Sequence, residues 1–120
     1  MKVTVLIENS SLPTAEFEPE FGLSLLIETK ESKILMDTGA SGRFELNAQK
    51  LGCDLSSVDW RVLSHGHYDH GGGLKAFFER NSRAPAALRR GAERAFYGSA
   101  APSLPGFLHR AGIVTRYIGL

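Results

Sequence analysis

Three of the four histidines in this 120-residue chain lie within six residues, and an aspartate completes the run His65-x-His67-x-Asp69-His70. Closely spaced imidazole and carboxylate groups are ligands that Zn²⁺ takes in proteins, and they also suit Fe or Mn. With 4 His and 4 Asp in the chain, this pattern arises by chance with a probability of about 10⁻⁴ over all windows. The run therefore predicts a metal site.

The spacing within the run predicts two pairs of ligands. In an extended segment, residues i and i+2 project to the same side, so His65 and His67 can offer two imidazoles to one cation. Asp69 and His70 follow where the chain turns toward a helix, and they can reach a second cation nearby. Gly66 and the glycines at 71–73 allow a tight or left-handed backbone and keep side chains from crowding the site. The alternatives are that these are surface histidines in a glycine-rich turn, or that Asp69 and His70 only cap the next helix.

A strand and a helix flank the run. Residues 60–64 have the apolar content of a short buried strand, and Leu74, Phe77 and Phe78 mark one face of an amphipathic helix. Tyr68, inside the run, suits either a hydrogen bond to a ligand or packing of its ring. The run thus lies between a strand and a helix, the context in which such a motif can hold a metal.

Three strands are predicted upstream. Residues 3–7 are rich in β-branched side chains, and residues 21–29 and 33–37 form a hairpin around a turn at 30–32. The connection at 9–21 is acidic and rich in turn residues, which predicts an exposed loop. The third strand ends at Asp37, which brings a carboxylate to a strand end.

A helix is predicted between the third strand and the strand at 60–64. Ser41 suits its N-cap, Phe44, Ala48 and Leu51 fall on one face, and Gly52 ends it. We interpret this helix as a packing element.

The segment after the run contains further candidate elements. A strand is predicted at 85–88, a helix at 91–97 and a final strand at 113–118. His109 stands alone there, and we interpret it as a surface residue rather than a ligand. The alternation of strands and helices predicts an α/β domain.

The residues quoted above resemble a known family. The run Ser64-His-Gly-His-Tyr-Asp-His, preceded by Phe21-Gly-Leu-Ser, Met36-Asp-Thr-Gly and Leu51-Gly, is similar to the metallo-β-lactamase superfamily of metal-dependent hydrolases. Within it, the pattern resembles the dihydropterin ribofuranosylaminobenzene phosphate synthase-like branch. The likeness covers residues 1–80 well and the remainder less clearly.

The resemblance implies roles for five residues. His65 and His67 bind one metal, and Asp69 and His70 bind the second. Asp37 supports the run from the neighbouring strand end, and Asp69 also orients the metal-bound water, so these two are the candidate catalytic residues. The implied reaction uses a metal-bound hydroxide on an ester, phosphodiester, lactone or amide-type bond of a small-molecule substrate.

The sequence departs from the family after the run. Family members add two histidines and a bridging aspartate, whereas only His109 and no aspartate follow Asp69 here. The family fold, two sheets packed between helices, also needs about twice this length. We therefore expect residues 1–120 to form a single partial domain, the N-terminal half of an αββα fold, with one mixed sheet and flanking helices.

A half-fold has consequences for ligands and partners. We expect Zn²⁺ (or Fe or Mn) to bind weakly or sub-stoichiometrically. A fragment, half of a split protein or a self-associating half would each leave a sheet face open, which predicts a homo-oligomer or a complementary C-terminal half chain.

Two other functions fit parts of the sequence. The half-domain suits a non-catalytic metal-binding or subunit-interaction module. Asp37-Thr38-Gly39 also resembles the active-site run of dimeric aspartic proteases, in which two Asp share one proton, but that hypothesis leaves the histidines unexplained.

Composition bears on three further properties: membrane insertion, cellular location and nucleic-acid binding. The chain is 42% hydrophobic and 22% charged, with no apolar run of about 20 residues and no secretory leader, so no membrane span is predicted. The single cysteine, Cys53, favours a cytoplasmic location. Residues 81–120 carry six arginines and one glutamate, without the interleaved aromatic residues of a nucleic-acid platform, so no nucleic acid is expected.

Overall fold

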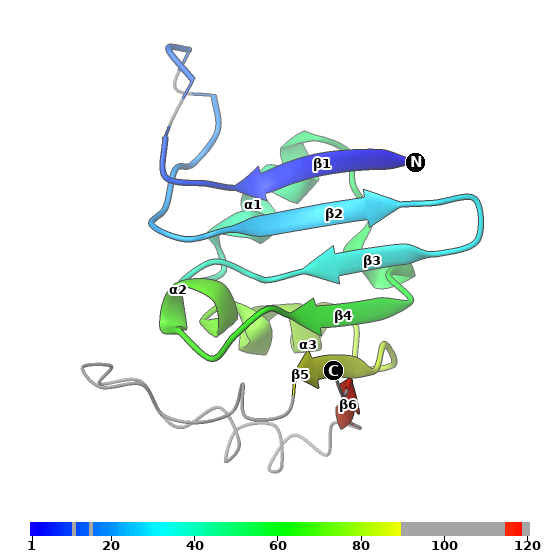
Figure 1. The fold of residues 1–120 in the computed structure, drawn as a ribbon. Helices are drawn as coiled ribbons and strands as arrows, with labels where there is room; N and C mark the ends of the chain where they lie inside the picture. Colours follow the sequence, from blue (N-terminus) through cyan, green and yellow to red (C-terminus); the bar gives the residue numbers. More distant parts are fainter. Residues whose placement is uncertain (11, 15, 90–114, 119–120) are drawn as a thin grey trace.

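One mixed sheet dominates the fold. The computed structural model describes residues 1–10, 12–14, 16–89 and 115–118. Within them, six strands lie side by side in their order along the chain (Figure 1). They are β1 (Lys2–Ile7), β2 (Ser24–Glu28), β3 (Lys33–Met36), β4 (Trp60–Leu63), β5 (Ala86–Arg89) and β6 (Thr115–Ile118). The first three strands pair antiparallel, and β3 to β6 pair parallel.

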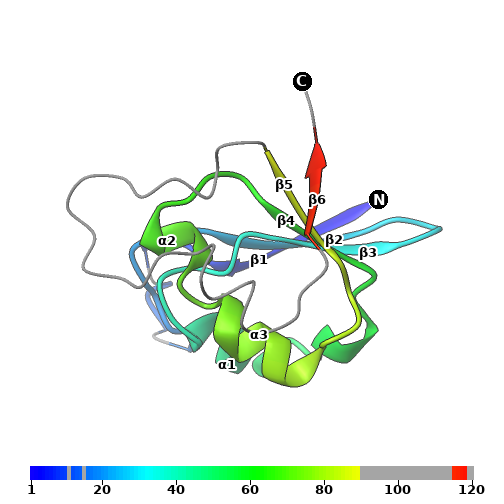
Figure 2. The same ribbon diagram turned by 90° about the horizontal axis from the view of Figure 1, so that it is seen from below.

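Two crossover helices cover one face of this sheet. α1 (Arg43–Lys50), followed by the 3₁₀ turn η1 (Leu55–Ser57), connects β3 to β4, and α3 (Leu74–Arg80) connects β4 to β5. Both crossovers advance by one strand in the same direction, so right-handed connections place α1 and α3 on the same face, as Figure 2 shows. The predicted mixed sheet with flanking helices is confirmed.

The core lies between the sheet and these helices. The inward side chains of neighbouring strands, such as Leu26 and Leu35, pair across the ladder and are 1% exposed. Phe44 of α1 and Phe77 of α3 pack on them with no exposed surface. The alternation that predicted these strands is thus produced by burial on one side.

The opposite face of the sheet is apolar as well. Its side chains form two cross-strand rows, Val3, Ile27, Ile34 and Trp60 in one, and Val5, Leu25, Met36 and Val62 in the other. None of the eight is buried, and Val3, Val5 and Trp60 are 37–51% exposed. No described helix covers this face (Figure 2). Since parallel strands are normally covered on both faces, this surface is suited to a second layer.

The helix between β3 and β4 differs from the prediction at both ends. Gly42, one residue after the predicted Ser41, is its N-cap, while the Ser41 Oγ accepts from the Arg43 N–H at 3.3 Å and its hydroxyl donates to Glu20. Leu51, predicted on the buried face, is 42% exposed, although its N–H still donates to the Asn47 carbonyl at 2.9 Å. Gly52 follows with a φ of 68°, the left-handed conformation expected after a helix.

The remaining predicted elements are present with shifted bounds where the structure describes them. The strand expected at 60–64 is β4, although Trp60 itself is 37% exposed. The strand expected at 113–118 corresponds to β6, whereas the helix expected at 91–97 and His109 lie outside the described residues. Within the described ranges, no helix is long and apolar enough to cross a membrane.

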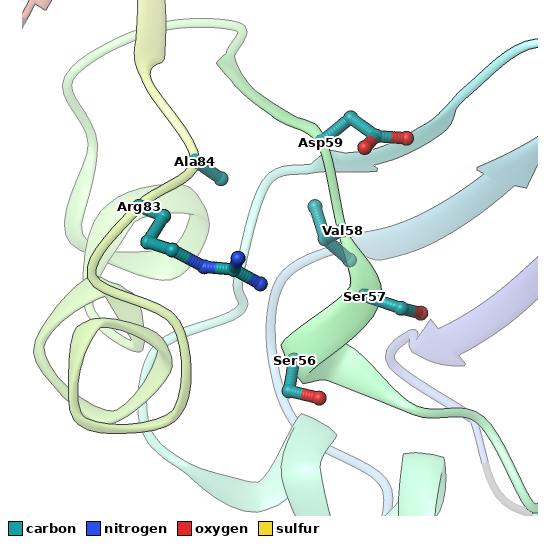
Figure 3. Close-up of a pocket in the computed structure, with 6 residues that line it drawn as sticks. All are labelled: Ser56, Ser57, Val58, Asp59, Arg83 and Ala84. Atoms are coloured by element: carbon teal, nitrogen blue, oxygen red, sulfur yellow. The ribbon is translucent and has the colours of Figure 1, made fainter.

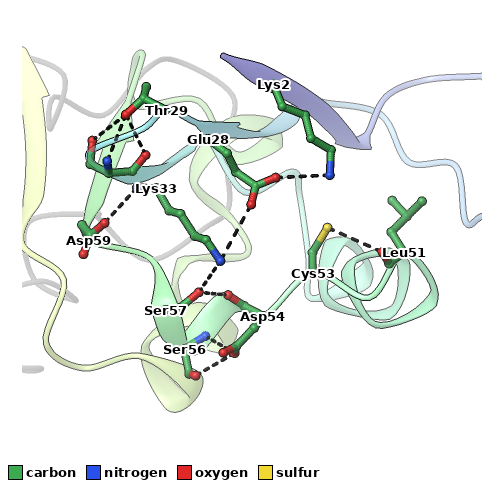
Figure 4. A network of polar contacts seen from close by, with 11 residues as sticks. Lys2, Glu28, Thr29, Lys33, Leu51, Cys53, Asp54, Ser56, Ser57 and Asp59 are labelled. Atoms are coloured by element: carbon green, nitrogen blue, oxygen red, sulfur yellow. Dashed lines mark hydrogen bonds and ion pairs between the residues drawn. The ribbon is translucent and has the colours of Figure 1, made fainter.

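Polar contacts join the β2–β3 turn to η1 at one end of the sheet (Figure 4). Glu28 forms ion pairs with Lys2 at 3.3 Å and Lys33 at 3.7 Å. The Lys33 ammonium also donates to Ser57 Oγ at 2.9 Å, and its backbone N–H donates to Asp59 Oδ2 at 2.8 Å. A single exposed ion pair contributes little to the free energy of unfolding. The main effect of the network is therefore to join η1 to the β2–β3 turn.

A buried arginine lies beneath α3. Arg61 is 2% exposed, and its guanidinium carbon is 3.5 Å from the ring centroid of Phe78 and 5.0 Å from that of Phe77. One nitrogen donates to the Ala84 carbonyl, whereas Nε and Nη1 have no partner among the described residues. Burial lowers the pKa of Arg61 to about 9. The charge is therefore a cost that packing on two rings only partly offsets.

The substitution Arg61→Met tests this cost. It keeps an unbranched side chain between the rings and removes the charge, so we expect the free energy of unfolding to stay the same or rise by about 1–4 kcal/mol. Urea unfolding followed by circular dichroism measures it. Arg61→Ala, which leaves a cavity, is the control and should lose stability. A loss for Arg61→Met equal to that for Arg61→Ala would contradict the assignment.

Candidate metal centre

Two neighbouring parallel strands bring the predicted site residues together. β3 and β4 run in the same direction, so the residues that follow them meet at one edge of the sheet. Asp37 follows β3, and the histidine run follows β4 and continues into the short helix α2 (Tyr68–Gly71). The Asp37 N–H donates to Val62 of β4 at 2.9 Å, which fixes the two strand ends against each other.

The Asp37 carboxylate lies at the base of the site. It is 1% exposed, and its backbone φ is 55°, in the left-handed region. Oδ1 accepts from the Ser64 N–H at 2.8 Å, and Oδ2 accepts from the Ser64 hydroxyl at 2.6 Å. Oδ2 also lies 2.7 Å from Nδ1 of His70. One carboxylate therefore contacts both ends of the histidine run.

These contacts assign the protons of two imidazoles. The Ser64 hydroxyl gives its hydrogen to Asp37, so it accepts from Nδ1 of His65 at 2.9 Å. His70 likewise donates from Nδ1 to Asp37. Both rings therefore carry the proton on Nδ1, and Nε2, which for His65 lies at hydrogen-bond distance from His67 Nδ1, is the unprotonated nitrogen that a metal-binding histidine uses.

The four predicted ligands form two close pairs. His65 Nε2 is 3.1 Å from His67 Nδ1, and His70 Nε2 is 3.5 Å from Asp69 Oδ2. Two ligand atoms of a tetrahedral zinc ion lie about 3.3 Å apart, given metal–ligand distances of about 2.0–2.1 Å. The rings of His65 and His70 are 4.2 Å apart, so the pairs adjoin each other.

The pairs do not add up to a complete site. In the part of the chain that the structure describes, no group of three or more His, Cys, Asp or Glu side chains is arranged to hold a metal ion. Zinc sites use three or four protein ligands, whereas each pair supplies two. The donor atoms thus fit two half-sites, and the metal-binding and catalytic roles of these residues stay predictions.

The glycines after the run act by their small size. Gly72 and Gly73 have φ of −64° and −83°, so of the roles expected for these glycines they show close packing without a left-handed backbone. A Cβ on Gly73 would lie 2.3 Å from two carbonyl oxygens of the β3–α1 loop, and one on Gly72 would lie 2.1 Å from another. Glycine is needed here because two backbones touch.

Sequence reasoning missed two residues that orient the run. Ser64 bridges Asp37 and His65, and Thr38 donates to the His70 carbonyl from both its N–H, at 2.7 Å, and its hydroxyl, at 3.1 Å. The sequence signal that could have identified them is their position, since Thr38 directly follows Asp37 and Ser64 directly precedes His65. Tyr68, in contrast, is 49% exposed, so its ring is not part of the core.

The geometry of Asp37 does not support an aspartic protease. In that mechanism two carboxylates face each other and share one proton. Here both carboxylate oxygens are held by Ser64 and His70 of the same chain, and the side chain has no exposed surface. It cannot meet a second copy of itself without losing these contacts.

Two hollows lie away from the site. A cavity of about 220 Å³ opens where β4 and β5 begin, at the end opposite the histidine run, between η1 and the turn at 81–84 (Figure 3). Its lining residues are Ser56, Ser57, Val58, Asp59, Arg83 and Ala84. A mainly apolar groove of about 590 Å³ runs along β1. Neither hollow contains a histidine.

Comparison with known proteins establishes the family. The profile of the metallo-beta-lactamase superfamily matches residues 17–116. The chain therefore belongs to this superfamily, and the resemblance predicted from its motifs is confirmed.

Relatives match this chain over only part of their length. Uncharacterized protein MJ0448 of Methanocaldococcus jannaschii is 34% identical over 79 residues, which are 66% of this chain and 30% of that protein. The 7,8-dihydropterin-6-methyl-4-(beta-D-ribofuranosyl)-aminobenzene-5'-phosphate synthase of the same organism is 35% identical over 79 residues, 62% of this chain and 27% of that protein. The chain thus spans less than a third of these curated relatives.

A solved structure shows the same fold. The crystal structure of Tm1679, a metal-dependent hydrolase of the beta-lactamase superfamily, superposes with a TM-score of 0.69 at 30% identity. The match covers 97% of this chain and 41% of Tm1679. The expected partial αββα architecture, with one mixed sheet and flanking helices, agrees with this coverage.

The pKa of His65 gives a prediction for the metal-free protein. Burial lowers this pKa below its ordinary 6.5, and the neighbouring His70 and His67 lower it further, against the opposing effect of two carboxylates. Below pH 6.5 the unfolded chain takes up a proton that the folded chain does not. Stability should therefore fall as the pH drops from 6.5 to the lower folded pKa.

Two measurements check this. An NMR titration of the His65 ring should have its midpoint below pH 6.5. Urea unfolding at several pH values should show that, below pH 6.5, the free energy of unfolding falls less steeply with decreasing pH in His65→Asn than in the wild type. A midpoint at or above 6.5 would contradict the assigned surroundings of the ring.

Proposed function

We propose that this chain carries one part of a metal-dependent hydrolytic centre for an ester, phosphodiester, lactone or amide-type bond in a small-molecule substrate. The observation that carries the proposal is the pairing of donor atoms, 3.1 Å and 3.5 Å apart, with the His70 ring held by Asp37 and the His65 ring held by Asp37 through Ser64. Membership of the superfamily and the likeness to Tm1679, a metal-dependent hydrolase, support it.

The proposed roles follow the two pairs. His65 and His67 would hold one ion, and Asp69 with His70 would hold a second, with Zn²⁺ as the proposed metal and Fe or Mn as alternatives. A bound ion supplies a nucleophile from water at neutral pH and polarises the bond under attack. Asp37 keeps the His65 and His70 lone pairs outward, and the second Asp69 oxygen can orient water or take a proton.

The ligand count sets the expected affinity. Each pair gives two protein ligands, fewer than a catalytic zinc site uses. We therefore expect one ion or less per chain, weakly bound through His65 and His67, with His70 as a further ligand.

A second candidate function is a non-catalytic metal-binding or subunit-interaction module. The eight apolar side chains on the open sheet face favour it, because such a face packs on a second sheet. That layer would come from a second copy of this chain or from a complementary half chain. The cytoplasmic location stays a proposal that rests on the single cysteine.

Metal uptake tests the ligand assignment. After equilibrium dialysis against Zn²⁺, the wild type should retain up to one ion per chain, and the double variant His65→Ala/His67→Ala should retain at least about tenfold less, since a zinc ion held by too few ligands binds weakly. His109→Ala, the same change at the histidine interpreted as a surface residue, is the matched control. Equal zinc in the wild type and the double variant would refute the assignment.

Activity assays distinguish the proposed hydrolase from the non-catalytic module. Phosphodiesterase, lactonase and thioesterase substrates are assayed with added Zn²⁺ or Mn²⁺. Activity that His67→Ala abolishes and His109→Ala leaves intact supports the hydrolase, whereas metal uptake without turnover of any of these substrates favours the module.

The open sheet face predicts a species larger than a monomer. Light scattering should give a mass above 13.1 kDa for the chain, and Val5→Asp should shift the mass toward the monomer by placing a charge on that face. Leu46→Asp, at a residue as exposed as Val5 but on α1, is the control. A monomer that does not bind a dye specific for apolar surface would argue against a partner.

A further inference from the structure

A carboxylate in the β1–β2 connection holds the loop that follows β3. Glu20 Oε2 accepts from the N–H groups of Ala40 and Ser41 at 2.9 and 3.0 Å, and Oε1 accepts from the Ser41 hydroxyl. These donors lie 20 and 21 residues away along the chain. Charge-assisted hydrogen bonds of this kind are about twice as strong as neutral ones.

Gly39 makes room for this carboxylate. Its φ is +68°, and a Cβ there would lie 2.7 Å from Glu20 Oε2. A side chain at position 39 would thus be strained and would displace the carboxylate. The Glu20 carboxylate can therefore occupy this position only because residue 39 is a glycine.

The held loop supports the second ligand pair. Thr38 donates to the His70 carbonyl, and the Gly73 N–H donates to the Gly39 carbonyl at 3.3 Å. The close approach of Gly72 and Gly73 to this loop means that α2 cannot shift toward it. The position of His70 is thus set by residues 38–41.

The connection that carries Glu20 also contacts Asp69 directly. The Leu23 N–H donates to the Asp69 carbonyl at 3.4 Å, and the Gly39 N–H donates to the Leu23 carbonyl at 2.9 Å. A Cβ on Gly22 would lie 2.0 Å from the Asp69 carbonyl oxygen. Three backbone segments, at 20–23, 37–41 and 69–73, therefore meet, and Glu20 joins the first to the second.

We propose that Glu20 is a positioning residue for the Asp69 and His70 ligand pair. This proposal rests on the proposed function, because the position of the Asp69 and His70 pair matters only if the pair binds metal. Glu20 touches neither ligand. It fixes the 38–41 loop, which fixes the His70 backbone and keeps Asp37 at hydrogen-bond distance from the His70 ring.

Metal affinity measured with three variants tests this role. Co²⁺ binding is followed by its absorption in competition with a chelator. Glu20→Ala should weaken binding about 10- to 100-fold, the usual effect of losing an outer support of a metal ligand. Glu20→Gln should restore affinity to within about threefold, because its amide oxygen still accepts from both N–H groups and its NH₂ can donate to Ser41.

Asn47→Ala is the matched control. Asn47 anchors the same connection two residues away, through three hydrogen bonds of 2.7–2.9 Å with Leu6 and Glu18, and does not contact the 38–41 loop. It should lose stability but keep its Co²⁺ affinity. If Asn47→Ala does not fold, Lys50→Ala, which removes an exposed contact to Glu16, takes its place. An equal fall in affinity in the control and in Glu20→Ala would overturn the proposal, as would unchanged affinity in Glu20→Ala.

Amide hydrogen exchange separates this proposal from the proposed function. In metal-free protein, Glu20→Ala should speed exchange at Thr38 and Gly73 and leave the β1–β2 ladder unchanged. If the wild type binds no Co²⁺, the proposed function fails, and faster exchange at these two amides still supports the loop-holding role. Unchanged exchange there would overturn it.

Discussion

The rest of the candidate centre depends on one buried carboxylate. Asp37 has almost no contact with solvent, and its two oxygens face a backbone N–H, a hydroxyl and an imidazole. A buried charge without such partners would cost several kcal/mol, roughly. The carboxylate therefore requires Ser64 and His70 to stay where they are, and they in turn set the tautomers and directions of the two rings that face outward.

Much of the strand pattern and the cluster of ligands could be predicted from sequence, because both depend on short-range spacing. The alternation at 3–7 and the His-x-His spacing each act within a few residues. Helix ends were less predictable: the Ser41 oxygen is shared between the Arg43 N–H and the distant Glu20 carboxylate, Gly42 is the N-cap, and Leu51 at the other end is 42% exposed. The Arg61 burial under α3 depends on packing that no local pattern encodes.

The candidate site likewise has a part that local spacing predicts and a part that depends on contacts between distant residues. Local spacing places His65 beside His67, but the contacts that orient the rings join residues 27 and 33 positions apart. The sequence placed Asp37 at a strand end but assigned its supporting role only through the family resemblance, and it held no signal for Glu20, whose partners lie 20 and 21 residues on. Of the two roles expected for glycines 72 and 73, the one that the structure shows is room for close backbone contact.

The left-handed backbone of Asp37 has a consequence for binding entropy. A non-glycine residue at a φ of 55° gives up about 1–2 kcal/mol of local stability, and three hydrogen bonds of 2.6–2.8 Å compensate for it. All of these hydrogen bonds are made by residues of the chain itself. The Nδ1 side of His70 is held by Asp37 and that of His65 by Ser64, so under the proposed function part of the ordering cost of a ligand pair would be met during folding.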